Sequence, residues 1–86
     1  MSSVSKGRQL SRSELNEGCE VIVECISKNS WPTDVRAIVE EDGVFRFTDP
    51  DGGFENSIKA AHWDGDTLVH PDGNRFVFYE LMRGEA

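Results

Sequence analysis

The sequence predicts a mainly β fold, α+β at most: a small antiparallel β-meander or open barrel of about five or six strands, with a short helical turn near its N-terminus. Two observations predict it. Apolar and polar residues alternate in "CEVIVECIS" and again in "RFVFYELM". Four Asp-Gly pairs are spaced 9, 13 and 8 residues apart, as the turns of a meandering sheet are; they begin at Asp42, Asp51, Asp64 and Asp72.

The chain has 86 residues and fits one domain. We expect a single small β domain over residues 14–83, preceded by a basic flexible arm, residues 1–13, and followed by a frayed C-terminus, residues 84–86. The arm and the domain differ in the sign of their net charge. The arm holds three bases and no acid, whereas the remaining residues hold all 16 acids and six bases, a net −10. The folded part should therefore repel nucleic acid.

The first element follows from a capping pattern. Ser11 lies three residues ahead of Glu14, as in a capping box, and Gly18 is suited to end the turn in a left-handed conformation. The strand that follows places Cys19, Val21, Val23 and Cys25 on one face. The opposite face mixes Glu20, Ile22, Glu24 and Ile26, so we expect a neighbouring element or a partner to cover part of it.

The rest of the chain reads as hairpins. Asp42-Gly43 separates the strands of a hairpin within residues 33–47. Residues 54–63 fit either a short helix or a strand; we favour a strand, because Asp64-Gly65 then sets up a hairpin with the residues that follow. Such a hairpin would place Trp63 opposite Asp66, and we expect Trp63 to belong to the core. The Pro-Asp-Gly stretches at 50–52 and 71–73 are typical of type I turns.

The two cysteines, six residues apart on one face of a strand, lie too far apart to bridge, and buried free thiols are expected. The chain has no apolar run long enough to span a membrane and no signal-peptide pattern. We therefore expect a cytoplasmic protein without a membrane partner.

Metal and catalytic sites are poorly supported. Neither acidic corner keeps the ligand spacing of an EF-hand, and His62 and His70 are weak metal candidates because nothing requires them to converge. No serine lies in a nucleophile elbow, and no phosphate-binding glycine motif is present. We expect no cofactor and no enzymatic activity.

The preferred function is a protein interaction module with an acidic and aromatic surface. Its candidate partner-binding residues are Trp31, Glu20, Glu24, Asp49, Asp51, Asp64 and Asp66. A sharper form is an inhibitor that mimics nucleic-acid charge in the basic groove of a nucleic-acid-binding protein. Size and charge resemble those of small acidic inhibitors used by phages and mobile elements, although no motif assigns the chain to them.

A second interpretation is a nucleic-acid-binding barrel. The stretch "ELNEGCEVIV" resembles the first strand region of an SH3-like barrel, a fold that implies binding of RNA or protein. Direct nucleic-acid contact would have to come from the arm, through Lys6, Arg8 and Arg12, since the folded part is acidic. A homodimer is a further alternative, because an exposed strand edge at "VIVECI" could pair with the same edge of another copy.

Overall fold

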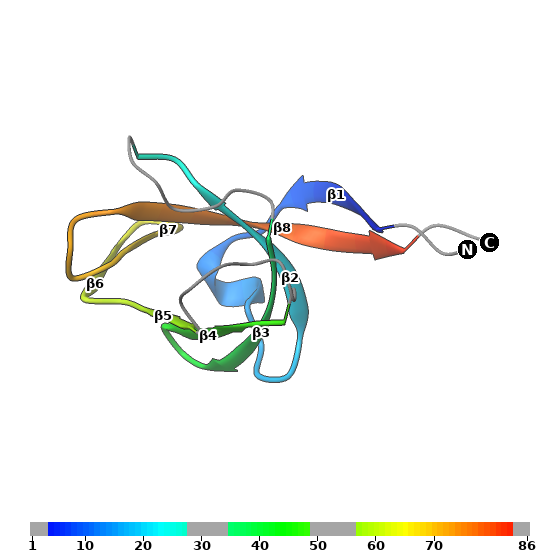
Figure 1. Cartoon of the computed structure of the whole chain (residues 1–86), viewed down its shortest axis with the longest axis horizontal. Helices are drawn as coiled ribbons and strands as arrows, with labels where there is room; N and C mark the ends of the chain where they lie inside the picture. Colours follow the sequence, from blue (N-terminus) through cyan, green and yellow to red (C-terminus); the bar gives the residue numbers. More distant parts are fainter. Residues whose placement is uncertain (1–3, 28–34, 49–56, 84–86) are drawn as a thin grey trace.

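A computed structural model describes residues 4–27, 35–48 and 57–83. These residues form a mainly β fold with eight antiparallel strands in one sheet and a single turn of 3-10 helix, η1 (Arg12–Glu14) (Figure 1). The strands are β1 (Val4–Gln9), β2 (Glu20–Cys25), β3 (Val35–Glu41), β4 (Val44–Phe47), β5 (Ser57–Lys59), β6 (His62–Asp64), β7 (Thr67–Val69) and β8 (Arg75–Arg83). The predicted fold class is confirmed.

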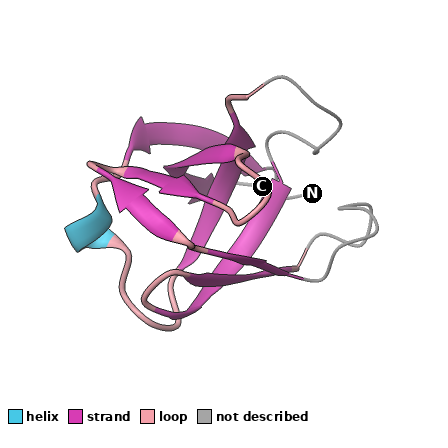
Figure 2. Cartoon of the chain, turned by 90° about the vertical axis from the view of Figure 1, so that its left-hand side faces the viewer, coloured by secondary structure: helices cyan, strands magenta, loops and turns pink. Residues whose placement is uncertain are grey.

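The sheet curls into a half-barrel (Figure 2). Its strand order is β5-β4-β3-β2-β8-β7-β6, so the two end strands, β5 and β6, follow each other in the chain. The link between them bonds to both sides: the Ala60 N–H donates to the Gly43 carbonyl at 2.7 Å, and the Ala61 N–H donates to the Val69 carbonyl at 2.8 Å. The eight strands exceed the predicted five or six, because residues 57–64 form two short strands and Val4–Gln9 adds another.

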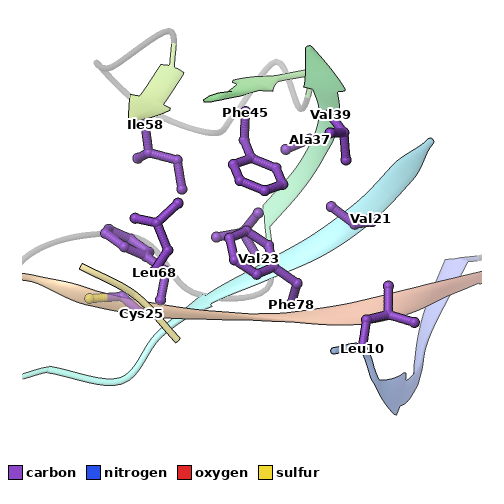
Figure 3. Packing of buried hydrophobic residues seen from close by; sticks show 11 residues of the cluster. Leu10, Val21, Val23, Cys25, Ala37, Val39, Phe45, Ile58, Leu68 and Phe78 are labelled. Carbon is purple, nitrogen blue, oxygen red and sulfur yellow. The ribbon is translucent and has the colours of Figure 1, made fainter. Parts of the chain in front are cut away.

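The core lies inside the curl. Phe45 of β4 stacks on Phe78 of β8 with ring centres 4.2 Å apart, and Figure 3 shows side chains from both halves of the sheet converging there. The alternation in the sequence places these residues inward, because successive side chains of a strand point to opposite faces. Trp63 is half-buried and packs against this cluster, as predicted. The largest fully buried side chains are Phe45, Phe76, Phe78, Ile58, Leu68, Val21, Val23 and Val39.

Two hairpins form at Asp-Gly pairs of the sequence, β3–β4 and β6–β7. Asp42-Gly43 joins β3 to β4, as predicted, with Gly43 at φ 83°. The β6–β7 turn is Gly65-Asp66, because Asp64 still pairs with Thr67. Trp63 consequently pairs with Leu68, and the predicted pairing with Asp66 is wrong by two residues.

The predicted basic arm contains a strand. β1 pairs with the end of β8, from Val4 opposite Arg83 to Gln9 opposite Tyr79. The strand forms because β8 runs past its partner β7, which pairs only with Arg75 and Phe76, and leaves the rest of that edge to β1. Gly7 also permits close approach: a Cβ there would lie 2.9 Å from Met82 Cγ. Residues 1–3 and 84–86, parts of the expected arm and frayed end, lie outside the described residues.

The N-terminal helical turn is confirmed, but it ends at Glu14 with Leu15 as its C-cap, and not at Gly18 as predicted. Gly18 does have the expected positive φ, 86°. The Ser11 N–H donates to the Glu14 carboxylate at 2.9 Å, the expected half of a capping box. The thiol prediction is right for Cys25, which is buried, and wrong for Cys19, which is exposed because β2 begins only at Glu20. Within the described ranges, no helix is long and apolar enough to cross a bilayer.

Candidate interaction surface

The end of β8 and strand β1 form a two-stranded extension that we call the ribbon, Val4–Gln9 with Leu81–Arg83. The pairing of β2 with β8 runs from Cys25 to Val21, which lies opposite Glu80. Residues of β8 after Glu80 pair with β1 alone among the described strands. Figure 1 shows the ribbon projecting from the half-barrel, with β1 in blue and β8 in red.

The ribbon has free strand edges. Within the described ranges, β1 pairs with β8 and with no other strand, and the last residues of β8 have a partner on one side only. A free edge presents backbone N–H and C=O groups that an extended segment can pair with. β2, by contrast, lies between β3 and β8, so the edge at "VIVECI" that was expected to invite a second copy does not exist.

The ribbon also exposes apolar surface. Met82 is 46% exposed, and Leu81 is half-buried. The second large exposed apolar side chain of the described chain is Ile26, 51% exposed, just after β2. Ile26 lies at the opposite end of β8, because its N–H donates to the Arg75 carbonyl at 2.8 Å.

One side chain of β1, that of Lys6, reaches across the outer face of β8 to β2. Lys6 Nζ lies 4.4 Å from the centre of the Tyr79 ring and donates to Glu24 at 3.2 Å. These contacts join β1, β8 and β2. They also keep the Lys6 ammonium on the side of β8 that faces away from the core.

A cavity of about 400 Å³ lies beside the ribbon, and we call it the notch. It is open to solvent and lies between β1, η1 and the start of β2. Leu10, Val21 and Leu81 supply its apolar part, and Glu14, Glu20 and Glu80 supply three carboxylates. Arg8 is the basic residue among those that line it, so the notch carries more negative than positive charge.

Arg8 and Glu14 form a two-point ion pair at the rim of the notch. The Arg8 guanidinium donates through both terminal nitrogens to the two Glu14 carboxylate oxygens. The hydrogen bond from Arg8, together with the bond from the Ser11 N–H, lowers the pKa of Glu14 to about 2. The same pair raises the pKa of the Arg8 guanidinium. Glu14 is therefore ionised at neutral pH and engaged by Arg8.

Glu80 occupies an unusual position. It follows Phe76 and Phe78 at alternating positions of β8 and pairs directly with Val21, which is 1% exposed. Directly opposed residues share a face, so the Glu80 side chain continues the row of core residues into the notch. It is half-buried, and within the described residues its carboxylate makes no hydrogen bond or ion pair, although its charge acts on Arg8.

The carboxylates predicted to bind a partner are engaged within the chain wherever they are described. Trp31, Asp49 and Asp51 lie outside the described residues. Each of the others accepts a hydrogen bond: Glu20 from Thr48 Oγ1 at 3.4 Å, Glu24 from Lys6, Asp64 from Arg75 at 2.9 Å and Asp66 from the Arg12 N–H at 3.0 Å. The bond from Arg75 also lowers the pKa of Asp64.

The three bases predicted for nucleic-acid contact are likewise paired. Lys6 contacts Glu24, Arg8 contacts Glu14, and Arg12 donates to Asp42 at 3.0 Å. Each base thus lies beside a carboxylate that would repel a phosphate.

The two histidines do not meet. His62 is exposed on β6, whereas His70 follows β7, lies edge-on to Phe76 and has its Nδ1 3.1 Å from Asp72 Oδ1. Asp72 instead orders the adjoining turn by accepting hydrogen bonds from Asn74 N–H and Nδ2. Among the residues that the structure places, no group of three or more His, Cys, Asp or Glu side chains could hold a metal ion.

The ribbon and the notch were not predicted as a site. The available signal was Glu80, an acid at an inward position after two phenylalanines. Comparison with family models, curated proteins and solved structures finds no match for this chain. The function is therefore inferred from the geometry of the chain.

Proposed function

We propose that this protein is a non-enzymatic interaction module that binds another protein through the ribbon. The observation that carries the proposal is the projection of β1 and the end of β8 beyond the half-barrel, with edges that no other described strand pairs with and an exposed Met82. An extended partner segment can add to such an edge as a further strand. Its backbone hydrogen bonds supply affinity and its side chains supply specificity.

The contacts on the ribbon support a docking role because they hold it in shape without a partner. Lys6 ties β1 to β2 through Glu24, and Gly7 lies directly against Glu80 and Met82. A preformed edge loses less conformational entropy on binding than a segment that must first become ordered. Natural sheets usually protect long edges, so a projecting edge with exposed apolar surface is typical of a binding site.

An interaction module fits the notch better than an enzyme does. The notch is open to solvent. Arg8 and Glu14, which line it, bind each other through both terminal nitrogens and both carboxylate oxygens, so neither group is available to a substrate. The buried thiol of Cys25 contacts the Ser27 hydroxyl, at 3.3 Å between sulfur and oxygen, and no basic side chain among its contacts with the described residues would activate it.

Mimicry of nucleic-acid charge is the narrower form of this proposal, and the structure supports it less. A mimic needs carboxylates that face the partner, whereas Glu24, Asp64 and Asp66 each bind a group of the same chain. The hypothesis of nucleic-acid binding has little support for the same reason, because Lys6, Arg8 and Arg12 each form an ion pair with a carboxylate of the chain.

A pair of matched substitutions tests the proposal. Met82→Gln and Ile26→Gln each replace one exposed apolar side chain, at positions about 23 Å apart along β8 at ~3.3 Å per residue. Proteins from cell extract are captured on each variant, at low and high salt, with a nuclease-treated sample in parallel. We expect partners held by the unmodified protein and by Ile26→Gln to be lost with Met82→Gln. Two results would contradict the proposal. Either the Met82→Gln variant captures the same proteins as the unmodified protein, or the captured material is nucleic acid that nuclease removes.

A further inference from the structure

We propose that the partner segment bound by the ribbon is basic, and that one of its arginine or lysine side chains enters the notch and pairs with Glu80. This inference rests on the proposed function and names the chemistry of the partner. Its basis is the position of Glu80: an ionisable group at an inward position, half-buried, with no hydrogen bond within the described residues. Such a group gains most from a cation that is brought into the same site.

The shape and lining of the notch suit a long basic side chain. Leu81 is half-buried and offers apolar surface for an aliphatic stem, whereas Leu10 and Val21, which also line the notch, are buried. Glu80 and Glu20 lie among the carboxylates around it. Arginine and lysine bury their methylene groups against apolar surface while they keep the charged end near oxygen ligands. Arg8 does not fill this role, because both of its terminal nitrogens bind Glu14.

Charge complementarity selects a basic partner rather than a second copy. The chain carries a net charge of −7, so two copies repel each other before contact. Antiparallel self-pairing of β1 about Gly7 would also place Lys6 opposite Arg8, and like charges directly opposed are destabilising. A basic strand is attracted by the net charge, and the positive charges of Lys6 and Arg8 that it would meet on β1 are offset by their carboxylate partners Glu24 and Glu14.

The test uses the full chain and a short synthetic peptide of alternating arginine and threonine, which places every arginine on one side of an extended strand. Amide signals are followed by NMR during titration, with an alternating glutamate and threonine peptide as the control ligand. We expect the arginine peptide to shift the signals of β1 and of residues 80–82, and the shifts to weaken as salt rises.

Two variants with the same change of net charge separate a specific site from general attraction. Glu80→Gln removes the notch carboxylate, and Glu41→Gln removes an exposed carboxylate at the β3–β4 turn. We expect Glu80→Gln to weaken peptide binding by roughly tenfold or more, and Glu41→Gln by less than about twofold. Mapping on the unmodified protein tests the proposal even if Glu80→Gln fails to fold.

Several results would overturn the inference: no shifts with the arginine peptide, shifts that map away from the ribbon, or equal weakening by both variants. Shifts at the ribbon that appear on raising the protein concentration alone would assign the surface to a second copy instead. If the arginine peptide fails while capture still depends on Met82, the basic partner is wrong and the proposed function stands. If capture is also independent of Met82, both are wrong.

Discussion

The guanidinium carbon of Arg12 lies 4.8 Å from the centre of the Trp63 ring, although 51 positions separate the two residues in the sequence. The same guanidinium donates to Asp42 at 3.0 Å, and the Arg12 N–H donates to Asp66 at 3.0 Å. Asp42 and Asp66 belong to the turns of two different hairpins, β3–β4 and β6–β7. η1 therefore links both hairpins across the half-barrel and lies over its one described tryptophan.

Replacing Arg12 should loosen this link. Arg12→Ala removes the stacking on Trp63 and the ion pair with Asp42, and we expect the free energy of unfolding to fall by about 1 to 2 kcal/mol. Urea denaturation followed by circular dichroism measures the change. Arg46→Ala is the matched control, because Arg46 is also an exposed arginine that pairs with one carboxylate, Glu40 at 3.2 Å, but has no ring contact among the described residues. Equal effects of the two substitutions would show that the ring contact contributes nothing.

Trp63 should contribute to stability through the core. Its ring centre lies 6.4 Å from that of Phe45 and 6.0 Å from that of Phe78, in an edge-on and a tilted arrangement. We expect Trp63→Ala to lower the free energy of unfolding by roughly 3 kcal/mol, near the lower end for buried aromatic residues because the ring is only half-buried. The midpoint of urea unfolding measures it, and an unchanged midpoint would mean that the ring is not part of the core in solution.

Gly7 should control the ribbon without affecting the half-barrel. A Cβ at Gly7 would lie 2.9 Å from Met82 Cγ and 3.0 Å from Glu80 Cβ, closer than carbon atoms pack, so β1 must shift. We expect Gly7→Ala to speed amide hydrogen exchange in β1 by about tenfold while β2 and β3 stay protected. Ser5→Ala is the control on the same strand. Unchanged exchange in β1 would contradict the close contact of Gly7 with Met82 and Glu80.

The ion pair at the notch predicts a pH dependence. The pKa of Glu14 is about 2 in the folded protein, against a usual value of 4.5, because Arg8 and the Ser11 N–H stabilise its charged form. The ionised carboxylate therefore stabilises the fold at pH above about 4.5, and this contribution is lost as the pH falls towards about 2.

Glu14→Gln removes that contribution at every pH. Its unfolding midpoint in urea should lie below that of the unmodified protein at pH 6, and the difference should shrink as the pH falls through the interval from about 4.5 to about 2. A difference that stays constant over this interval would show that Glu14 acts by packing and not by its charge.

The sequence allowed much of the fold to be predicted where one residue pattern dominates. The alternation around Val21 and Val23 identified β2, and Asp42-Gly43 located the β3–β4 turn. The β6–β7 turn was misplaced by one residue, because Gly65, with φ 64°, takes the first of its two turn positions instead of the second. A short hairpin with one glycine allows both registers, and the observed one packs Trp63 against Phe78 and Phe45, which are far away in the sequence.

The candidate site was harder to predict. Val4–Gln9 is polar and contains glycine, so its own residues do not favour a strand. It forms one because no other described strand pairs with that edge of β8 beyond Phe76. Glu20, Glu24, Asp64 and Asp66 were predicted as partner contacts from composition, whereas their bonds within the chain depend on residues far away in the sequence, such as Thr48 and Arg75. Distant contacts of this kind are not encoded in local spacing.

The central claim is that the ribbon is the surface through which this protein binds its partner. The most direct test is amide hydrogen exchange of the protein, free and bound to a partner captured as described above. The account predicts slower exchange on binding in residues 4–9 and 80–83, with little change in the β3–β4 hairpin. Protection confined to the β3–β4 and β6–β7 turns, with β1 unchanged, would contradict it.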